Sequence, residues 1–371
     1  MEVFQGCPFS HFANYGLQLK ERKVFRLESP DIGDLFHAAL KNIADSLRIN
    51  GIDWRDLTEE QCDKLAAKAV EELAPRLQKE ILLSSNRYHY IMHKLQKIIS
   101  RASKILSDHA KASGFAPVGI ELGFGKKGPL PPISFHLDNG STMELVGRID
   151  RVDKAESSKG VLLRVIDYKS SQKALNLTEV YYGLALQMLT YLDVIITHSK
   201  DWIGTTAKPA GVLYFHIHDP LIHSNKVLPE DKIEEEIFKR FKMKGLLLGD
   251  EESVRLMDQS LGTGYSQIVS AAIKKDGSFY SNSQVASEEE LGYLRNHVRG
   301  VFKNTGNRIT NGEIDIAPYK LKDKTPCTFC PFKSVCQFDQ SLEENNYRVL
   351  PNESKEVILE RIRNGGVKIH D

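Results

Sequence analysis

The chain has 371 residues and carries 50 Lys and Arg against 49 Asp and Glu, so its formal net charge is +1. This balance gives no general sign of a nucleic-acid binder, and any DNA contact must come from local basic patches. The apolar share of 41% is that of an ordinary globular protein. No apolar run reaches the length of a membrane-spanning helix, and five cysteines in so long a chain exclude a disulfide scaffold.

The first residues contain a cysteine close to the start, followed by a short helix predicted from Ser10 to Tyr15. Cys7 and Pro8 stand where a secretory signal would need an apolar core, so we expect a cytoplasmic protein. The abrupt beginning suggests a fragment or an engineered boundary rather than a natural N-terminus.

A helical region follows, with helices expected at residues 31–48, 58–83 and 86–112, the first capped by Asp31. His37 lies on the first helix, where a lone histidine is more often solvated or satisfied than a ligand. Cys62 lies on the second, an amphipathic helix, and we interpret it as an unliganded thiol.

A basic stripe is predicted on the third helix, because four cations recur three or four residues apart. Such a stripe could follow a DNA backbone, although spacing alone favours a solvated helix face. The cations are Lys94, Lys97, Arg101 and Lys104.

The first core strand is predicted at residues 117–124 and carries Glu121. The glycines of residues 123–128 match G-x-G-x-x-G, but a dinucleotide fingerprint must open a helix. Pro129, Pro131 and Pro132 follow and forbid one. The chain also has no G-x-x-x-x-G-K-[ST] motif, so it contains no P-loop ATPase.

A hairpin is predicted next, from a long, partly buried strand over residues 143–153, a polar loop at 154–160 and an apolar central strand at 161–166. It puts Asp150 near the end of one strand and Asp167 on its neighbour. Asp167 and Lys169 are two residues apart and therefore point the same way.

This arrangement has a chemical use. Neighbouring carboxylates repel one another and are costly to desolvate, and a cation such as Mg²⁺ removes the conflict. A metal-bound water can attack a phosphodiester, while Lys169 orients or deprotonates it or stabilises charge. An ordinary surface Asp–Lys pair is the alternative, and spacing alone leaves both open.

A helix at residues 177–196 makes Gln187 and Tyr191 surface neighbours. The following strand, 210–218, carries His216 and His218. Their H-x-H spacing resembles half of a zinc hydrolase site, a weak signal without the other half.

In residues 219–310 we expect helices at 231–241 and 288–304. We assign no catalytic or ligand-binding residues to this part of the chain. A last helix is predicted at residues 354–363, near the end of the chain.

A ligand spacing, C-x2-C-x5-C, is formed by Cys327, Cys330 and Cys336. A closed site needs a fourth thiolate. Cys7 is favoured over Cys62, because Cys-Pro-Phe recurs at both Cys7 and Cys330. Zn²⁺ or a [4Fe–4S] cluster could use these thiolates, and the clasp would contribute a few kcal/mol to stability.

Several of these motifs resemble, in order and approximate distance, those of the RecB-like branch of the PD-(D/E)XK nucleases. They are Gly33-Asp34-Leu35-Phe36-His37, Gly147-Arg148-Ile149-Asp150-Arg151, Asp167-Tyr168-Lys169 and Gln187-x-x-x-Tyr191. The resemblance implies that His37, Asp150 and Asp167 hold Mg²⁺, a site that Mn²⁺ or Ca²⁺ could also occupy. It implies that Lys169 is catalytic, that Gln187 and Tyr191 lie beside the site, and that Glu121 supports it.

The cysteines and their flanks resemble the AddB-type subunits of bacterial helicase–nucleases. The resemblance implies a structural [4Fe–4S] cluster on Cys7, Cys327, Cys330 and Cys336. It also implies an AddA-type partner, a missing N-terminal helicase-like part, and degradation of the 5′-terminated strand at broken DNA ends. A DNA-end-binding module, with hydrolysis by a partner subunit, is the alternative.

The expected fold is α/β, a restriction-endonuclease-like sheet flanked by helices, with a clasp joining the two ends. The expected parts are an N-terminal clasp segment (residues 1–30), a helical region carrying His37 (31–115), a nuclease core with insertions (116–310), a cysteine-rich C-terminal clasp (311–345) and a tail (346–371).

Overall fold

The computed structural model describes all residues except 23, 344 and 366–371, so the end of the predicted tail lies outside the described residues. Six strands of the middle of the chain form one mixed sheet in the order β1-β4-β5-β6-β7-β10. Strands β1, β4 and β5 are antiparallel neighbours, and β5 and β6 run parallel. The strands are β1 (Ala116–Phe124), β4 (Gly147–Ser157), β5 (Gly160–Lys169), β6 (Ala207–His216), β7 (Lys244–Leu248) and β10 (Val285–Ala286).

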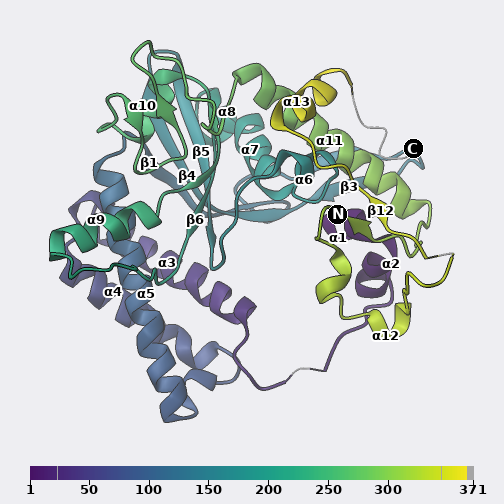
Figure 1. Cartoon of the computed structure of the whole chain (residues 1–371), viewed down its shortest axis with the longest axis horizontal. Coiled ribbons are helices and arrows are strands. Elements are labelled where there is room, and N and C mark those ends of the chain that lie inside the picture. The colour runs from purple at the N-terminus through teal and green to yellow at the C-terminus, as the bar shows by residue number, and fades with distance from the viewer. Residues whose placement is uncertain (23, 344, 366–371) are drawn as a thin grey trace.

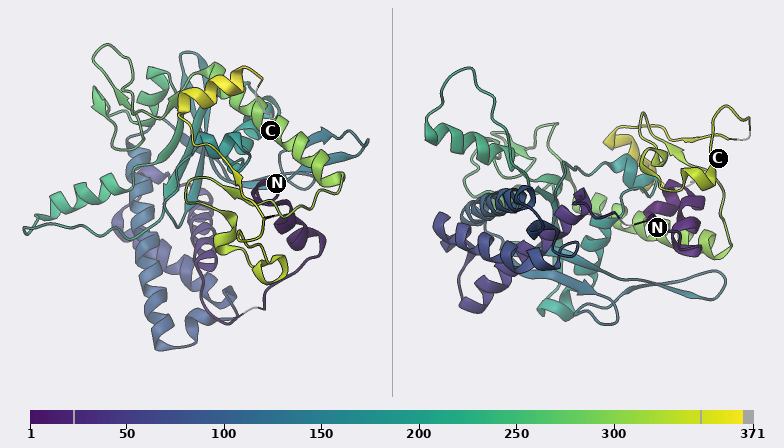
Figure 2. Two further views of the ribbon diagram at one scale, coloured as in Figure 1. Left: turned by 45° about the vertical axis from the view of Figure 1, so that its right-hand side comes forward. Right: turned by 90° about the horizontal axis from the view of Figure 1, so that it is seen from below.

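Helices cover both faces of this sheet, so the core has three layers (Figures 1 and 2). On one face lie α3 (Ser29–Asn50), α4 (Glu59–Leu73) and α5 (Asn86–Lys111), and His109 of α5 packs edge-on against Phe215 of β6. On the other lie α6 (Leu177–Tyr181) and α7 (Gln187–Thr197), with Tyr191 against Phe124 of β1. The expected α/β sheet flanked by helices is confirmed.

The long helix α11 (Glu288–Thr310) packs outside α7 and is joined to it by charge. Asp193 of α7 is buried, and Arg295 and Arg299 of α11 reach its two carboxylate oxygens at 2.7 and 2.6 Å. A capping box between Ser287 and Glu290 starts α11. Two carboxylate oxygens shared by two guanidinium groups fix the outer helix on the inner one.

Local sequence explains where the predicted helical region differs from the structure. Asp31 is not the cap of α3 but its third residue, and it completes a capping box with Glu28. The predicted helix at residues 58–83 ends at Leu73, because Pro75 cannot continue it. Two short 3-10 turns, Ala74–Arg76 and Ile81–Leu83, replace its second half.

The predicted strand over residues 143–153 is broken at Val146, which is 64% exposed. Its first part is β3 (Thr142–Leu145), which pairs with β2 (Ile133–His136) in a separate ribbon. Gly147 starts β4 beneath the ring of Phe124, where a Cβ atom would lie 2.8 Å from Phe124 Cε1. The hairpin is confirmed, but its loop is shorter than predicted, since Ser157 already pairs with Gly160.

The predicted helix at residues 177–196 is two helices, α6 and α7. Gly183 between them has φ +74°, the left-handed conformation that glycine tolerates, and a Cβ there would lie 2.8 Å from Gln5 Cγ. Strand β6 ends at His216, two residues earlier than predicted, so His218 lies beyond the sheet.

The N-terminal segment lies against residues 315–348, far from it in the sequence (Figure 1). The predicted helix at residues 10–15 is instead α2 (Pro8–His11) followed by a π-helical turn (Phe12–Gly16). Phe9 N donates to Asp315 O at 3.0 Å, and Arg348 donates to Gln5 O at 2.5 Å. Other elements are α1 (Glu2–Gly6), α8 (Ser199–Ile203), α9 (Glu230–Arg240), α10 (Glu251–Met257), β8 (Gly264–Tyr265), β9 (Ala272–Ile273), β11 (Tyr319–Lys320), α12 (Lys333–Cys336), β12 (Arg348–Val349) and α13 (Lys355–Arg363).

An ionic cluster is buried between the sheet and helices α3 to α5. Asp153 of β4 is 0% exposed and receives Arg151 Nε at 2.6 Å and Arg164 Nη2 at 2.8 Å. The guanidinium groups lie over Trp54 and Phe115, with centroid distances of 5.7 and 4.5 Å. Burial opposes ionisation of Asp153, but the two arginines outweigh it and lower its pKa.

No helix in the described part of the chain is long and apolar enough to cross a membrane.

Candidate metal centre

The two carboxylates predicted on the hairpin lie side by side. The register of β4 and β5 aligns Arg151 with Ile166, which places Asp150 beside Asp167 on the same side of the sheet. Both are buried, with Asp150 8% and Asp167 1% exposed. Asp150 Oδ2 accepts a hydrogen bond from the backbone N–H of Tyr168 at 2.8 Å.

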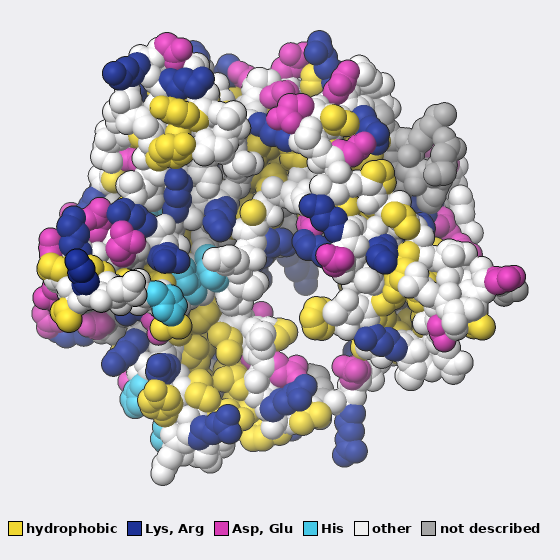
Figure 3. Space-filling model, in the orientation of Figure 1, with side chains coloured by type: hydrophobic (Ala, Val, Ile, Leu, Met, Phe, Trp, Pro, Cys, Tyr) yellow, Lys and Arg dark blue, Asp and Glu magenta, His cyan; other side chains and the backbone are white. Residues whose placement is uncertain are grey.

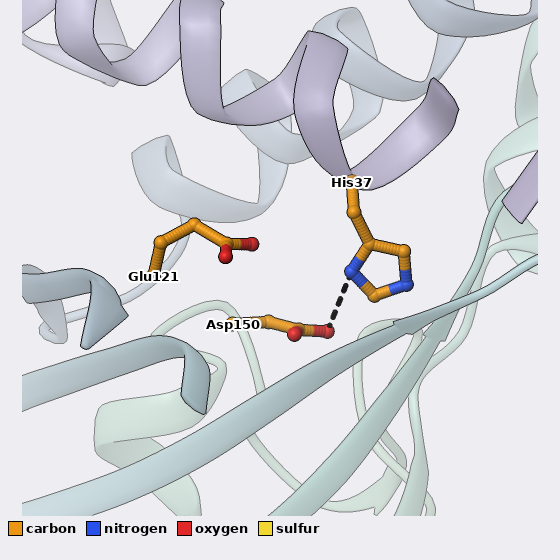
Figure 4. Close-up of side chains that lie close together, drawn as sticks. All are labelled: His37, Glu121 and Asp150. Carbon is orange, nitrogen blue, oxygen red and sulfur yellow. Dashed lines mark ion pairs between the residues drawn. The ribbon is translucent and has the colours of Figure 1, made fainter. Parts of the chain in front are cut away.

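Two further ligand-type side chains reach Asp150 from other elements (Figure 4). His37 extends from α3, and its Nδ1 lies 3.1 Å from Asp150 Oδ2. Glu121 comes from β1, whose register with β4 pairs Ile120 with Arg151 and so brings Glu121 opposite Asp150. One ligand atom of each of the three residues lies within 4.8 Å of the others.

Glu121 has a strained backbone, with φ +49° in a strand. Strain of this kind in a residue other than glycine concentrates at functional sites. Arg148 Nη1 approaches its carboxylate at 3.4 Å from the solvent side. The sequence predicts a supporting role for Glu121. In the structure, Glu121 forms a tight group with His37 and Asp150, and Asp167 is not part of that group.

The lysine predicted to be catalytic is paired with Asp167. Lys169 Nζ lies 2.5 Å from Asp167 Oδ2. Across the site, Gln187 Nε2 donates to the hydroxyl of Tyr191 at 2.9 Å. Burial raises the pKa of Tyr191 to about 12, so its hydroxyl keeps its proton at neutral pH.

The carboxylates repel one another strongly. Burial and the charge of Asp150 raise the pKa of Asp167 to about 6, although Lys169 and His37 oppose the change. Burial and Asp150 likewise raise the pKa of Glu121. For His37, burial lowers the pKa, but its hydrogen bond to Asp150 and the nearby carboxylates outweigh burial and raise it.

This donor set fits a divalent cation. A bound cation would relieve the repulsion that raises these pKa values. Carboxylate oxygens are the ligands of Mg²⁺, Mn²⁺ and Ca²⁺, and one imidazole is compatible with a first-row metal. Within the described residues, this is the one cluster of at least three such side chains held so tightly.

The basic stripe keeps its predicted geometry on α5, but acidic neighbours neutralise half of it. Arg101 pairs with Asp219, and Lys104 pairs with Glu59 and Glu234 at 2.8 and 3.2 Å. Lys94 lies over the ring of Tyr90. Pairing leaves less charge for a DNA backbone, so DNA binding by Lys94, Lys97, Arg101 and Lys104 stays a prediction.

The four clasp cysteines come from both ends of the chain. Cys7 is buried, and Cys327, Cys330 and Cys336 are partly exposed. Burial raises the pKa of Cys336, a backbone hydrogen bond at Phe338 opposes the change, and the other three thiols add to it, so all four sulfur atoms share one region. Cys62 lies elsewhere, 0% exposed in α4, where burial raises the pKa of its thiol to about 11.

Two residues beside the site were missed from the sequence. Strand β6 aligns Tyr214 with Asp167, and Lys173 Nζ lies 5.7 Å from the centre of the Tyr214 ring. The alternation of side chains along β6 could have placed Tyr214 on the same face of the sheet as Asp167. Lys173 follows Lys169 by four residues in a polar loop, a position that no periodic pattern marks.

Comparison with known proteins identifies the family of the chain. Residues 1–337 match the model of the PD-(D/E)XK nuclease superfamily, and the chain belongs to that superfamily.

Curated relatives are similar over almost the whole chain. The ATP-dependent helicase/deoxyribonuclease subunit (type B) of Bacillus licheniformis is 67% identical over 363 residues, which are 98% of this chain and 31% of that protein. The proteins of the same name from Bacillus subtilis and Geobacillus kaustophilus are 66% and 55% identical, again over 98% of this chain and 31% of theirs. The chain thus spans about a third of the length of these relatives.

Proposed function

We propose that this chain is the metal-dependent deoxyribonuclease domain of a bacterial helicase–nuclease that processes double-strand breaks for recombinational repair. One observation carries the proposal: His37, Glu121 and Asp150 converge within 4.8 Å beside the Asp167–Lys169 pair. A carboxylate pair on neighbouring strands, with a lysine two residues on, supplies the groups that phosphodiester hydrolysis needs.

The chain's own residues position the reaction. His37, Asp150 and Asp167, with Glu121 beside them, would hold Mg²⁺, which when bound supplies a reactive water and offsets phosphate charge. The ammonium group of Lys169, held 2.5 Å from Asp167, would donate hydrogen bonds to the water or to the phosphate. Gln187, anchored on Tyr191, would help to orient these groups from α7.

The wider assignment also comes from the relatives. Their name includes a helicase as well as a deoxyribonuclease, and the chain covers only 31% of their length. We therefore propose that the whole protein has a helicase-like part outside this domain. From the resemblance of the motifs alone, we also propose an AddA-type partner subunit and degradation of the 5′-terminated strand.

The direct test of activity is metal-dependent loss of labelled linear DNA. We expect the chain to degrade 5′-labelled and 3′-labelled strands at different rates with Mg²⁺ or Mn²⁺, and to be inactive in EDTA. A chain that binds DNA ends without cleaving them would instead be an end-binding module whose partner hydrolyses the DNA. The complete set of site residues argues against that alternative.

We further propose that Cys7, Cys327, Cys330 and Cys336 hold a structural [4Fe–4S] cluster. Cys7 comes from one end of the chain and the other three cysteines from the opposite end. The choice of an iron–sulfur group over Zn²⁺ rests on the resemblance of the cysteines and their flanks to AddB-type subunits.

Cys7→Ser is expected to abolish the cluster and loosen both chain ends, whereas Cys62→Ser should keep the cluster, because Cys62 lies in the helical layer. The measurement is the visible absorbance, iron and sulfide of anaerobically purified protein. About four irons per wild-type chain are expected. A colourless protein containing zinc, or iron retained in Cys7→Ser, would contradict the assignment.

Metal binding should weaken on acidification, because Asp167 binds a proton below a pKa of about 6. Its pKa is raised, so the carboxylate is free for a cation at pH 7.5 and largely protonated at pH 5. We expect Mn²⁺ affinity to fall roughly tenfold per unit below pH 6 for each proton displaced. Calorimetric titration measures this change, and Asp167→Asn should bind more weakly with a flatter pH dependence. Equal wild-type affinity at pH 5 and 7.5 would refute the expectation.

A further inference from the structure

Three aromatic rings form a column at the end of strand β6. The rings of His216 and His218 are stacked, with centroids 4.1 Å apart and an angle of 10° between their planes. His218 in turn lies against Phe241, with centroids 4.6 Å apart. Phe241 is 1% exposed and forms a rigid base, while both histidines are partly exposed.

The column lies next to the catalytic lysine. In the parallel pair β5–β6, His216 is aligned with Lys169, and Ile217 N donates to Lys169 O at 2.8 Å. The His216 ring also contacts the backbone of Ser170, the residue after Lys169. A group stacked on the column would therefore lie beside the site where phosphodiester cleavage is proposed.

The arrangement of the ring nitrogens argues against a metal site here. Nδ1 of His218 is 3.0 Å from the backbone oxygen of His216, and the His216 ring is engaged at Ser170. No third metal-binding side chain groups with them among the described residues. Burial lowers the pKa of both rings, and the neighbouring His218 lowers that of His216 further. The neutral forms, which are suited to stacking, are therefore favoured at pH 7.

A basic groove adjoins the column. It has a volume of about 700 Å³, and its charged lining residues are four lysines and two glutamates: Lys173, Lys244, Lys324, Lys355, Glu179 and Glu353. Lys324 pairs with Glu179 at 2.9 Å, whereas Lys173 and Lys244 are exposed and form no ion pair with a described residue. The register of β6 and β7 aligns Lys244 with Tyr214, two residues before His216, so one end of the groove lies near the column. Figure 3 shows histidine side chains on the face that carries lysines and arginines around the central opening.

We propose that this column is a stacking platform for an unpaired nucleobase, and that Lys173 and Lys244 hold the adjoining backbone phosphates of a single strand. Proteins that bind single strands combine aromatic rings, which accept any base, with a basic groove along the phosphates. The platform fixes the position of the strand relative to Lys169. This inference rests on the proposed nuclease function and names the residues that would position its substrate.

The test is a double substitution with a matched control, using a single-stranded oligonucleotide containing 2-aminopurine, with Ca²⁺ replacing Mg²⁺. His216→Leu/His218→Leu removes stacking, whereas His216→Phe/His218→Phe keeps it. We expect about tenfold weaker binding and a loss of 2-aminopurine quenching for the leucine pair, and near wild-type binding for the phenylalanine pair. Thermal unfolding should show both pairs folded, as expected for partly exposed side chains.

An abasic scan of the oligonucleotide tests the same contact from the side of the DNA. One abasic position near the cleaved bond should weaken wild-type binding about tenfold and should not weaken the leucine pair further. Abasic effects that are equal in both proteins, or a phenylalanine pair as weak as the leucine pair, would overturn the platform. Cleavage by the wild type is measured in parallel with Mg²⁺. If the wild type cleaves while the histidine variants match it, the platform alone fails. If the wild type neither binds nor cleaves, the nuclease proposal fails.

Discussion

Replacing Lys169 by Ala is expected to lower kcat for metal-dependent DNA cleavage by roughly two to four orders of magnitude while leaving KM near the wild-type value. In the described part of the chain, Lys169 is the one lysine paired with a carboxylate of the site, through Asp167 at 2.5 Å. The substitution removes the positive charge that would stabilise the reacting phosphate, but it removes no ligand of the cation. Steady-state hydrolysis of a short labelled oligonucleotide measures both constants.

Lys208→Ala provides the control for this change. Lys208 lies at the far end of β6, aligned with Leu162, and pairs with Glu288 at 2.9 Å. Its removal should change kcat less than about twofold, because Lys208 lies at the end of β6 away from Lys169. The exposed ion pair also contributes at most about 1 kcal/mol to the stability of the fold. Cleavage by Lys169→Ala at the wild-type rate would remove Lys169 from the mechanism.

Asp153→Asn is expected to destabilise the fold by about 3–5 kcal/mol, a large part of the 5–15 kcal/mol typical of a domain. The substitution leaves Arg151 and Arg164 buried, each 2% exposed, without their shared counter-charge. Because the pKa of Asp153 is lowered, its contribution is present at neutral pH and is lost as pH falls through that value. Urea unfolding at pH 7.5 gives the free energy.

Two comparisons sharpen the result. Asp45→Asn removes a half-buried surface partner of Lys41 and Arg48 and should cost at most about 1 kcal/mol. Replacing all three charges together, by Arg151→Met, Asp153→Leu and Arg164→Met, should recover much of the loss, because no unpaired charge stays buried. An Asp153→Asn protein as stable as Asp45→Asn would show that the cluster does not hold the helical layer on the sheet.

Much of this fold could be predicted from the sequence, because residues close together in the chain determine these strands, turns and helices. The hairpin that carries Asp150 and Asp167 follows from alternation and a polar turn, and α5 follows from a long amphipathic pattern. Where prediction was wrong, tertiary contacts decided. Gly147 starts a new strand because the Phe124 ring occupies the space of a side chain, and Gly183 breaks a helix where Gln5 approaches from the other end of the chain.

The candidate site shows the same limit. The Asp167–Lys169 pair is close in sequence and was predicted with its geometry. Glu121 joins His37 and Asp150 only through the register of β1 against β4, which alternation does not give. Arg164 interrupts an apolar run and could have indicated a buried ion pair, but its partner Asp153 lies on another strand.

The location of bound Mn²⁺ tests the central claim most directly. We would soak crystals of the chain with Mn²⁺ and record anomalous scattering at the manganese edge. The proposal predicts a peak bounded by His37, Asp150 and the carboxylates of Glu121 and Asp167, lost in Asp150→Asn. No peak there at saturating Mn²⁺, in a protein that still degrades DNA, would contradict the assignment and place the catalytic centre elsewhere.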